Sequence, residues 1–445
     1  MQSLQIAALL VVAIADTCIS ATRTASSVSL ADVQSCVDLS SNGDTVNIPA
    51  GSAVWTNGLV VSGKGINIIG TGAASTIISN AWSTAYNYEH FVYVNAGPSA
   101  FTRLSGFAIY AIDNNVASQI CIGTTTTTNY FRVDNVTLSS VAHAGLMIQG
   151  WAVGVIDNCT INQKVNTSAT GISIVGEGEH SWDTRPPSWG DTNKVYIEDC
   201  VFQWSGNGNG AVDAYNGARF CFRNNSITNV NVGNHGTDSS GANRSCHSFE
   251  VYGNRFTETS GSTTLFLSFR GGTGLIFSNT ITGNHVYSFA MLQNYRTTGT
   301  NIYEGLTPCC DPWGPVNGSN QYDGNADQYG WPAYDSIGRT SPTEYHTGTA
   351  LNGSTNGYTV QASYPLYLWS NSVNGAPLTV TVGNSYNNTG DYARIPPATE
   401  IIKENRDYYV DVVKTGYTPL SYPHPLVLLA GVDATPHTNN WIWVR

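Results

Sequence analysis

A short motif recurs along this chain at a nearly constant interval, and it limits the possible folds more than any other feature. In each copy, β-branched or aromatic residues flank a polar pair that ends in Asn or Cys, as in Ile156-Asp-Asn-Cys159-Thr-Ile161. The steps from residue 200 to residue 279 are 25, 29 and 25 residues. A period of this length is typical of a repeat architecture. The repeated positions are Cys159, Cys200, Asn225, Asn254, Asn279 and Asn371.

Each repeat contains short β-branched stretches separated by turn residues, and helical periodicity is nearly absent. The pattern predicts one coil of a parallel β-helix, in which successive coils stack about 4.8 Å apart. The repeated Asn residues then form a column whose amides hydrogen-bond from coil to coil, so we interpret them as structural. Cys159 and Cys200 share the column as a thiol ladder or a disulfide, and Cys221 and Cys246 are a comparable pair.

Composition excludes several classes of function. The 445 residues carry a net charge of -11 and include only 11% charged residues. Without a basic excess, the chain lacks the charge that binds phosphate backbones or anionic membranes. We therefore expect no nucleic-acid partner and no membrane partner, and we expect a monomer.

The first residues resemble an export signal. The apolar run from Leu4 to Ala15 is too short to span a bilayer and ends near small residues. We interpret residues 1–21 as a signal peptide and residues 22–445 as the mature domain. A secreted or cell-surface location, extracellular or periplasmic, follows, and the eight cysteines left after cleavage are free to form disulfides there.

Several segments resemble a known superfamily. Leu30–Val37 predicts a short helix, and Gly43–Gly51 followed by Lys64–Gly72 is similar to the first coils of the pectin-lyase-like parallel β-helix superfamily. The resemblance implies an all-β fold: a single-stranded right-handed parallel β-helix, or solenoid, with an N-terminal capping helix. It does not define the reaction, because the superfamily includes lyases, hydrolases, esterases and binders. Exported bacterial β-helix proteins share three further segments: Asn234–Asp238, Arg270–Gly274 and Tyr422–Leu426.

Two regions depart from the repeat. An aromatic-rich insertion at about 284–365 contains Trp313 and Trp331, which can stack on sugar faces as part of a wall or lid, or can simply cover apolar coils. A tail at about 395–445 is expected to cap the last coil. Within the insertion, three residues space oxygen ligands as a calcium loop does, but the Gly and the bidentate Glu of such a loop are missing, which favours an ordinary acidic turn. They are Asp323, Asn325 and Asp327.

One local concentration of basic residues indicates where chemistry takes place. Five Arg and no Lys lie between residues 213 and 270. For β-elimination on a uronate polymer, a cation must neutralise the carboxylate, a base must take the C5 proton, and an acid must protonate the leaving oxygen. We predict His235 as the base, although a structural turn histidine is the alternative. The other candidates are Asp238 to orient the base, Arg244 and Arg270 to clamp the carboxylate, Tyr215 or Tyr295 as the acid, and Asp213 and Asp191 nearby.

These predictions leave the reaction open. Counting back from the Asn column places Asp191, Asn216 (close to Asp213), Arg244 and Arg270 at roughly equivalent points of successive coils, as a stripe on one face. Glycoside hydrolysis needs two carboxyl groups, which Asp191, Asp213 and Asp238 can supply. The signatures typical of polygalacturonases and of pectate lyases are both missing. We favour a polysaccharide lyase, with a glycoside hydrolase or a non-catalytic glycan-binding surface protein as the alternatives, and with calcium as the one cofactor considered.

Overall fold

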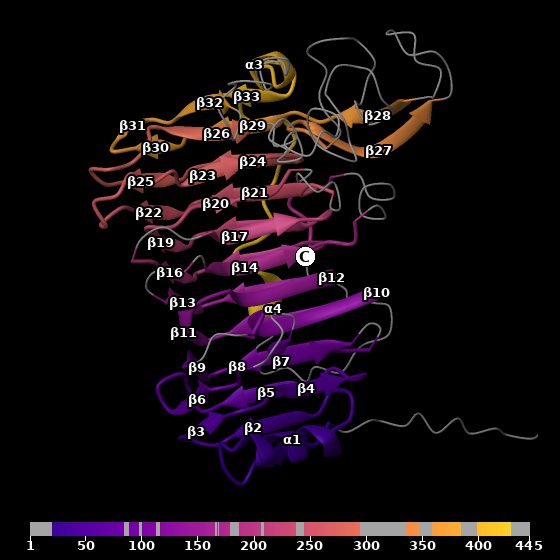
Figure 1. The fold of residues 1–445 in the computed structure, drawn as a ribbon. Helices are drawn as coiled ribbons and strands as arrows, with labels where there is room; N and C mark the ends of the chain where they lie inside the picture. Colours follow the sequence, from indigo (N-terminus) through magenta and orange to yellow (C-terminus); the bar gives the residue numbers. More distant parts are fainter. Residues whose placement is uncertain are drawn as a thin grey trace, which may run out of the picture.

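The computed structural model has an all-β architecture of stacked coils, and most strands pair in parallel. Each coil contributes up to three strands, so the strands form three columns along the length of the molecule (Figure 1). The structure describes residues 20–83, 89–97, 100–112, 116–164, 167, 169–178, 187–205, 209–236, 244–293, 335–346, 358–383 and 398–428.

The first column begins near the N-terminus and ends in the C-terminal region. Its strands pair in register from coil to coil, for example Glu198 with Arg223 and Arg223 with Tyr252. The strands are β1 (Thr22–Thr24), β2 (Thr45–Ile48), β5 (Asn67–Gly70), β8 (Phe101–Ser105), the second parts of β10 (Ser118–Asp134) and β12 (Ala144–Asp157), β15 (Val195–Glu198), β18 (Arg219–Arg223), β21 (Ser248–Tyr252), β24 (Thr273–Phe277), β29 (Leu366–Trp369) and β33 (Tyr408–Val410).

The second column precedes the first within each coil, and it carries the candidate site discussed below. Its strands are β4 (Leu59–Ser62), β7 (His90–Asn95), the first parts of β10 and β12, β14 (Thr170–Val175), β17 (Gly210–Tyr215), β20 (Val232–Gly233), β23 (Leu267–Phe269), β26 (Phe289–Gln293) and β32 (Thr379–Gly383).

The third column is a separate sheet of shorter strands that follows the motif turn. Its strands are β3 (Gly51–Trp55), β6 (Thr76–Asn80), β9 (Ala108–Ala111), β11 (Thr137–Val141), β13 (Thr160–Gln163), β16 (Val201–Gln203), β19 (Ser226–Thr228), β22 (Arg255–Thr257), β25 (Thr280–Thr282), β30 (Ser372–Val373) and the antiparallel β31 (Ala376–Pro377). Apart from the columns, β27 (Arg339–His346) and β28 (Tyr358–Ser363) form an antiparallel pair.

The repeated motif forms the turn from the first column to the third. The residue before the motif Asn or Cys has a positive φ, for example 57° at Asn224 and 54° at Ser278, and this bends the chain sharply. The side chain of the motif Asn points inward and accepts a hydrogen bond from the backbone of the preceding coil. The backbone N–H of Asn225 donates to Oδ1 of Asn254 at 2.9 Å, and that of Asn254 donates to Oδ1 of Asn279 at 3.1 Å. The predicted column of Asn side chains is therefore confirmed.

The cysteines in and near this column are thiols. Cys159 and Cys200 are free and buried, and Sγ of Cys200 donates to the carbonyl of Glu198 at 3.3 Å. Cys221 and Cys246 are also free. Of the two alternatives left open by the sequence, the structure has the thiol ladder.

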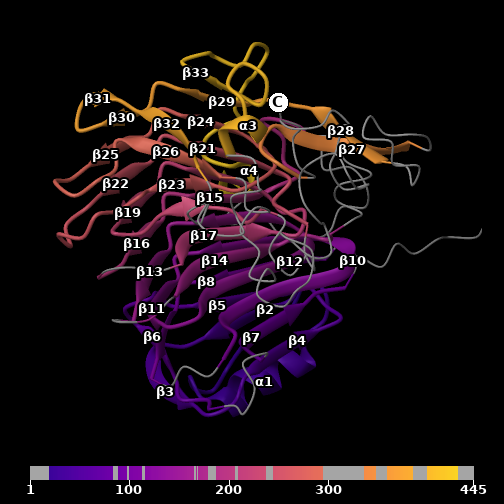
Figure 2. The same cartoon turned by 45° about the horizontal axis from the view of Figure 1, so that its top comes forward.

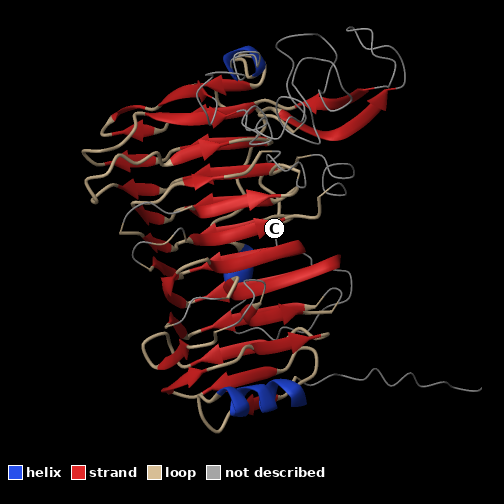
Figure 3. Cartoon of the chain, in the orientation of Figure 1, coloured by secondary structure: helices blue, strands red, loops and turns tan. Residues whose placement is uncertain are grey.

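Helix α1 (Leu30–Leu39) covers the first coil, and it is the blue helix at the bottom of Figure 3. The side chain of Ser29 accepts a hydrogen bond from the N–H of Asp32, which satisfies an otherwise unpaired donor at the helix start. Val33 and Val37 face the core. The helix predicted for Leu30–Val37 is confirmed. No helix within the described part of the chain is long and apolar enough to cross a membrane.

The tail reaches much further than the last coil. After the short α3 (Ala398–Ile401), β33 adds to β29 as the expected cap does. The chain then runs back along the outside of the first column and ends, within the described residues, at α4 (Pro425–Leu428). In Figure 1, α4 lies near the level of β12 and β10, and Figure 2 shows it beside the stacked strands. The carbonyl of Val427 accepts from Arg132 of β10, which fixes this position.

Candidate functional site

The strands of the second column alternate between core and surface. On β17, Val212 and Ala214 are buried, whereas Asp213 and Tyr215 point outward and are half-buried. The register pairs Asp213 with Ser173 and Tyr215 with Val175 of the preceding coil. Outward side chains of successive coils therefore lie in two stripes along this face, spaced by about 4.8 Å.

His235 stands beside β17, just after β20. Its backbone N–H donates to the carbonyl of Ala214 at 2.9 Å, which aligns it with Tyr215. Its Nε2 lies 3.1 Å from Oδ2 of Asp213. The side chains are 28% and 20% exposed, so the pair is open to solvent. Gly233 lies next to Asp213 in the following coil, two residues before His235, and a Cβ there would stand 2.3 Å from the carbonyl oxygen of Ser268. Only glycine fits at this close approach of two strands.

Arg270 and Tyr215 flank the His235 position along the same stripe. The rings of Tyr215 and His235 are 5.5 Å apart between centroids, with a tilt of 60°. Arg270 follows β23 in the next coil, and its Nε donates to the carbonyl of Asn234 at 2.9 Å. The Asn234 side chain accepts from the N–H of Arg270 at 2.7 Å. Asn234 thereby connects the backbone that carries His235 to Arg270.

Four predicted site residues are therefore brought together on one face: Asp213, Tyr215, His235 and Arg270. The carboxylate next to His235 is Asp213, whereas the predicted orienting residue, Asp238, lies outside the described residues. The positioning role of Asn234 was missed, because its motif signalled only the resemblance. Chemically, the group offers an imidazole held by a carboxylate, a phenol and a guanidinium within neighbouring coils.

Arg244 does not belong to this stripe. It is only 2% exposed, and its Nε and Nη2 donate to the two carboxylate oxygens of Asp335 at 2.6 and 2.7 Å. The same carboxylate accepts from the N–H of Ser245. The prediction counted residues along the coil, and such a count does not determine where a side chain points. The carboxylate that Arg244 binds belongs to the protein itself.

Asp191 also lies elsewhere. Its Oδ1 accepts from Nζ of Lys194 at 2.7 Å, and Nζ also lies 3.1 Å from Oε1 of Glu250. Burial raises the pKa of Asp191, but the Lys194 ammonium and the hydrogen bonds outweigh burial and hold the pKa below its usual range. This group contacts the tail, since Tyr417 Oη donates to Glu250 at 2.6 Å. The stripe predicted to join Asp191, Arg244 and Arg270 is therefore not formed.

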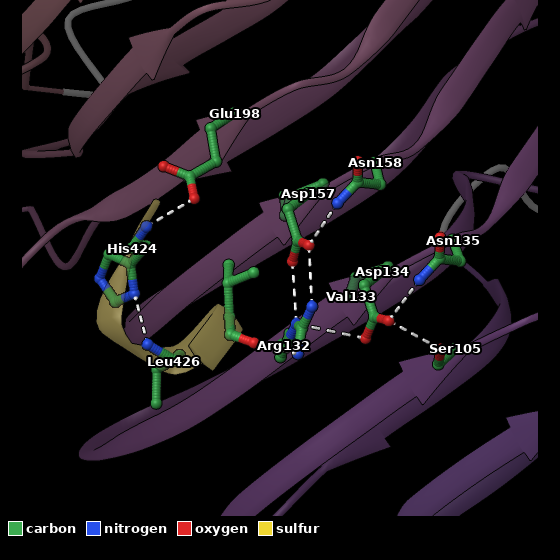
Figure 4. Close-up of polar contacts among 12 residues, drawn as sticks. Ser105, Arg132, Val133, Asp134, Asn135, Asp157, Asn158, Glu198, His424 and Leu426 are labelled. Atoms are coloured by element: carbon green, nitrogen blue, oxygen red, sulfur yellow. Dashed lines mark hydrogen bonds and ion pairs between the residues drawn. The ribbon is translucent and has the colours of Figure 1, made fainter. Parts of the chain in front are cut away.

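A second cluster of charged residues lies on the first column under the tail (Figure 4). Arg132 donates to both carboxylate oxygens of Asp157 at 2.9 Å, and its Nε lies 3.4 Å from Asp134. One coil beyond Asp157, Glu198 accepts from the backbone N–H of His424 at 2.7 Å. The carboxylates of this cluster are fully buried.

Arg223 extends this cluster into the next coil. It donates to Glu198 at 2.7 Å and to the carbonyls of Leu420 and Ser421 in the tail. Burial, together with the positive charges of Arg223 and Arg132, lowers the pKa of His424 to about 3. We call Arg132, Asp157, Glu198, Arg223 and His424 the tail cluster. Glu198 is therefore the buried acidic partner of Arg223.

The remaining predicted residues lie outside the described residues: Tyr295, Trp313, Trp331, Asp323, Asn325 and Asp327, besides Asp238. Within the described ranges, no group of three or more His, Cys, Asp or Glu side chains is placed to hold a metal ion. The calcium loop and the aromatic wall stay predictions.

Comparisons with known proteins give one weak likeness. No family model matches the sequence, and no curated protein matches it. Among solved structures, the chain is similar to an alginate lyase from Paenibacillus sp. str. FPU-7, with a TM-score of 0.36 and 13% sequence identity. The alignment covers 60% of this chain and 99% of the lyase. A TM-score this low supports no argument about the reaction of this chain.

Proposed function

We propose that this protein is a secreted polysaccharide lyase that cleaves a uronate-containing glycan by β-elimination on the second column. We further propose that its solenoid is the right-handed parallel β-helix of the pectin-lyase-like superfamily. One observation carries the functional proposal. His235 and Asp213 are in hydrogen-bond contact on a half-exposed face, with Tyr215 and Arg270 in the adjacent coils.

The shape of this face suits a polymer. Outward positions repeat once per coil, so a chain that lies along the solenoid meets a new side chain about every 4.8 Å. The catalytic group then occupies a few coils, and the coils on either side remain to bind further sugars. A small metabolite would need a closed pocket, in which most of its surface is buried.

The residues divide the chemistry as follows. When His235 donates Nε2–H to Asp213, Nδ1 carries the lone pair that accepts the C5 proton. The C5–H electron pair forms the C4–C5 double bond as the bond from C4 to the glycosidic oxygen breaks. Arg270 neutralises the uronate carboxylate, which stabilises negative charge at C5. Tyr215 protonates the leaving oxygen.

Glycoside hydrolysis is less well supported by the described residues. That reaction needs two carboxyl groups on either side of the scissile bond. Asp213 is on the second column, whereas Asp191 is paired with Lys194 on the tail side. Asp238 lies outside the described residues, and so the second carboxyl group is not accounted for.

The test is turnover of a panel of neutral and uronate polysaccharides by the full chain, with and without calcium. Ultraviolet absorbance reports unsaturated uronates, and a second assay reports new reducing ends. We expect both signals to rise together on at least one uronate polymer. New reducing ends without ultraviolet absorbance would indicate hydrolysis instead of elimination. Binding without either product would indicate a glycan-binding protein.

A further inference from the structure

The second column carries very little positive charge. Its strand segments contain no Lys or Arg, and the cation of the site, Arg270, directly follows β23. Because a polyanion needs a counter-charge at each bound carboxylate, this distribution bears on which polymer the face can hold. The following inference rests on the function proposed above.

The stripe that contains His235 can be followed coil by coil. The register pairs Gln149 with Val175, and Val175 with Tyr215. His235 and Arg270 come next, and Gln293 follows Arg270 when the pairing of β23 with β26 is continued by one residue. The side chains two coils away from His235 are therefore Val175 on one side and Gln293 on the other. Both are half-buried and uncharged.

The parallel stripe is no more basic. Ser173 pairs with Asp213, and Ser268 pairs with Gly233 on one side and Met291 on the other. Asp213 is the charged member of this stripe among the described residues, and its charge is negative. A second acidic side chain, Glu177, follows Val175 by two residues and lies between Gly176 and Gly178, which donate to the carbonyls of Tyr215 and Asn216.

A homopolymer of uronate would fit this face poorly. One coil is similar in length to one sugar unit, so every bound unit would present a carboxylate to its own coil. One carboxylate would meet Arg270. The carboxylate on one side of it would lie over Gln293, and those on the other side would lie over the coils of His235, Tyr215 with Asp213, and Val175, whose strand segments carry no Lys or Arg. Desolvation without a cation and repulsion by Asp213 both oppose that arrangement. The net charge of -11 on the whole chain adds a weaker, salt-screened repulsion.

We infer that the site takes a heteropolysaccharide in which an isolated uronate is flanked by uncharged sugars. Arg270 binds the uronate, the Gln293 coil binds the neutral sugar on one side, and the Val175 coil, three coils from Arg270, binds a neutral sugar on the other side. Neutral sugars suit these positions, because an amide hydrogen-bonds hydroxyl groups and an aliphatic side chain packs against a sugar face. Arg270 thus selects the unit that is cleaved, and the coils around it select against further charge.

The experiment compares elimination by the full chain on two substrates, a homopolyuronate and a heteropolymer with isolated uronates. We expect kcat/KM to be at least about tenfold higher on the heteropolymer, given the cost of placing like charges together. Adding salt should raise kcat/KM on the homopolyuronate, because salt screens repulsion between charges. The difference in kcat/KM between the two substrates should therefore become smaller.

Two variants sharpen the test. Gln293→Arg adds a cation two coils from His235 and should shift the ratio of kcat/KM values toward the homopolyuronate, whereas Gln293→Asn, which keeps an uncharged amide, should not. Equal or faster elimination of the homopolyuronate by the wild-type chain would overturn this inference and leave the lyase proposal intact. Absence of unsaturated product from both substrates would instead overturn the lyase proposal, and the inference with it.

Discussion

Two faces of this solenoid carry ionisable side chains. They are buried on one face and partly exposed to solvent on the other. On the first column, Arg223 and Glu198 are fully buried, and the returning tail covers them. On the second column, His235 and Asp213 form a contact of similar length but remain 28% and 20% exposed. Removing one partner from an ion pair that is excluded from water destabilises the fold, because the other charge is left buried without a counter-charge. A histidine and carboxylate left open on a long face are available to a ligand.

The largest expected effect of this difference between the two faces is on activity, at His235. We expect His235→Ala to lower kcat/KM for elimination by about 10²–10⁴-fold, the usual contribution of a general base. Stability should change by less than about 0.5 kcal/mol, because the side chain is half-exposed and packs on the surface. Turnover assays and urea unfolding measure the two effects. Undiminished turnover in this variant would contradict the assignment of His235.

Arg223→Ala should mainly lower the free energy of unfolding, whereas His235→Ala should mainly lower activity. Removing this guanidinium leaves Glu198 buried without its partner, and two tail carbonyls lose their donors. We expect a loss of about 3–5 kcal/mol in the free energy of unfolding. Arg255→Ala is the matched control, since Arg255 on β22 is exposed, and its effect should stay within about 0.5 kcal/mol. Similar losses in both variants would show that the tail cluster does not stabilise the fold.

The tail cluster should also make stability depend on pH. The pKa of His424 is about 3 in the folded chain, below its ordinary value, so the unfolded chain binds a proton first as the pH falls. Folding stability should therefore decrease from about pH 6.5 downward, with a slope of up to about 1.4 kcal/mol per pH unit. Urea unfolding at pH 7 and pH 5 measures it.

His424→Asn should remove this part of the slope, because Asn does not titrate and can still accept the N–H of Leu426. A variant with the same slope as the wild type would assign the pH dependence to other groups.

The smallest effect is expected where the tail meets β21. Tyr417 Oη donates to Glu250, whose carboxylate is fully buried. Tyr417→Phe should cost about 1–3 kcal/mol of unfolding free energy, since it leaves a buried acceptor without this donor. Tyr422 makes a comparable bond to Asp199 but is 55% exposed, so Tyr422→Phe should cost less. If Tyr422→Phe were the more damaging change, burial would not explain the strength of the tail contacts.

The parts of the fold that the sequence predicted are those governed by local chemistry. A residue that bends the chain, followed by Asn, recurs in each coil, and the Asn residues from 225 to 371 form the predicted ladder. The helix at Leu30–Leu39 follows from its Ser29 cap and its apolar positions. The sequence also allowed us to group His235, Asp213 and Arg270, because these residues lie in a few neighbouring coils.

Other features required the folded chain, because their partners are far apart in sequence. Arg244 was expected to face a ligand, but it binds Asp335, which is 91 residues away. Asp191 was expected on the same stripe, but Lys194 and Glu250 hold it on the tail side.

The sequence by itself determined the repeat, the ladder of Asn residues and the grouping of His, Asp and Arg, since each of these depends on spacing within or between adjacent coils. Only the tertiary structure decided which charges are buried. The return of the tail, which brings His424 to Glu198 across 226 residues, converts one set of charged side chains into a buried structural cluster. Burial depends on what the rest of the chain covers, and no local pattern contains that information.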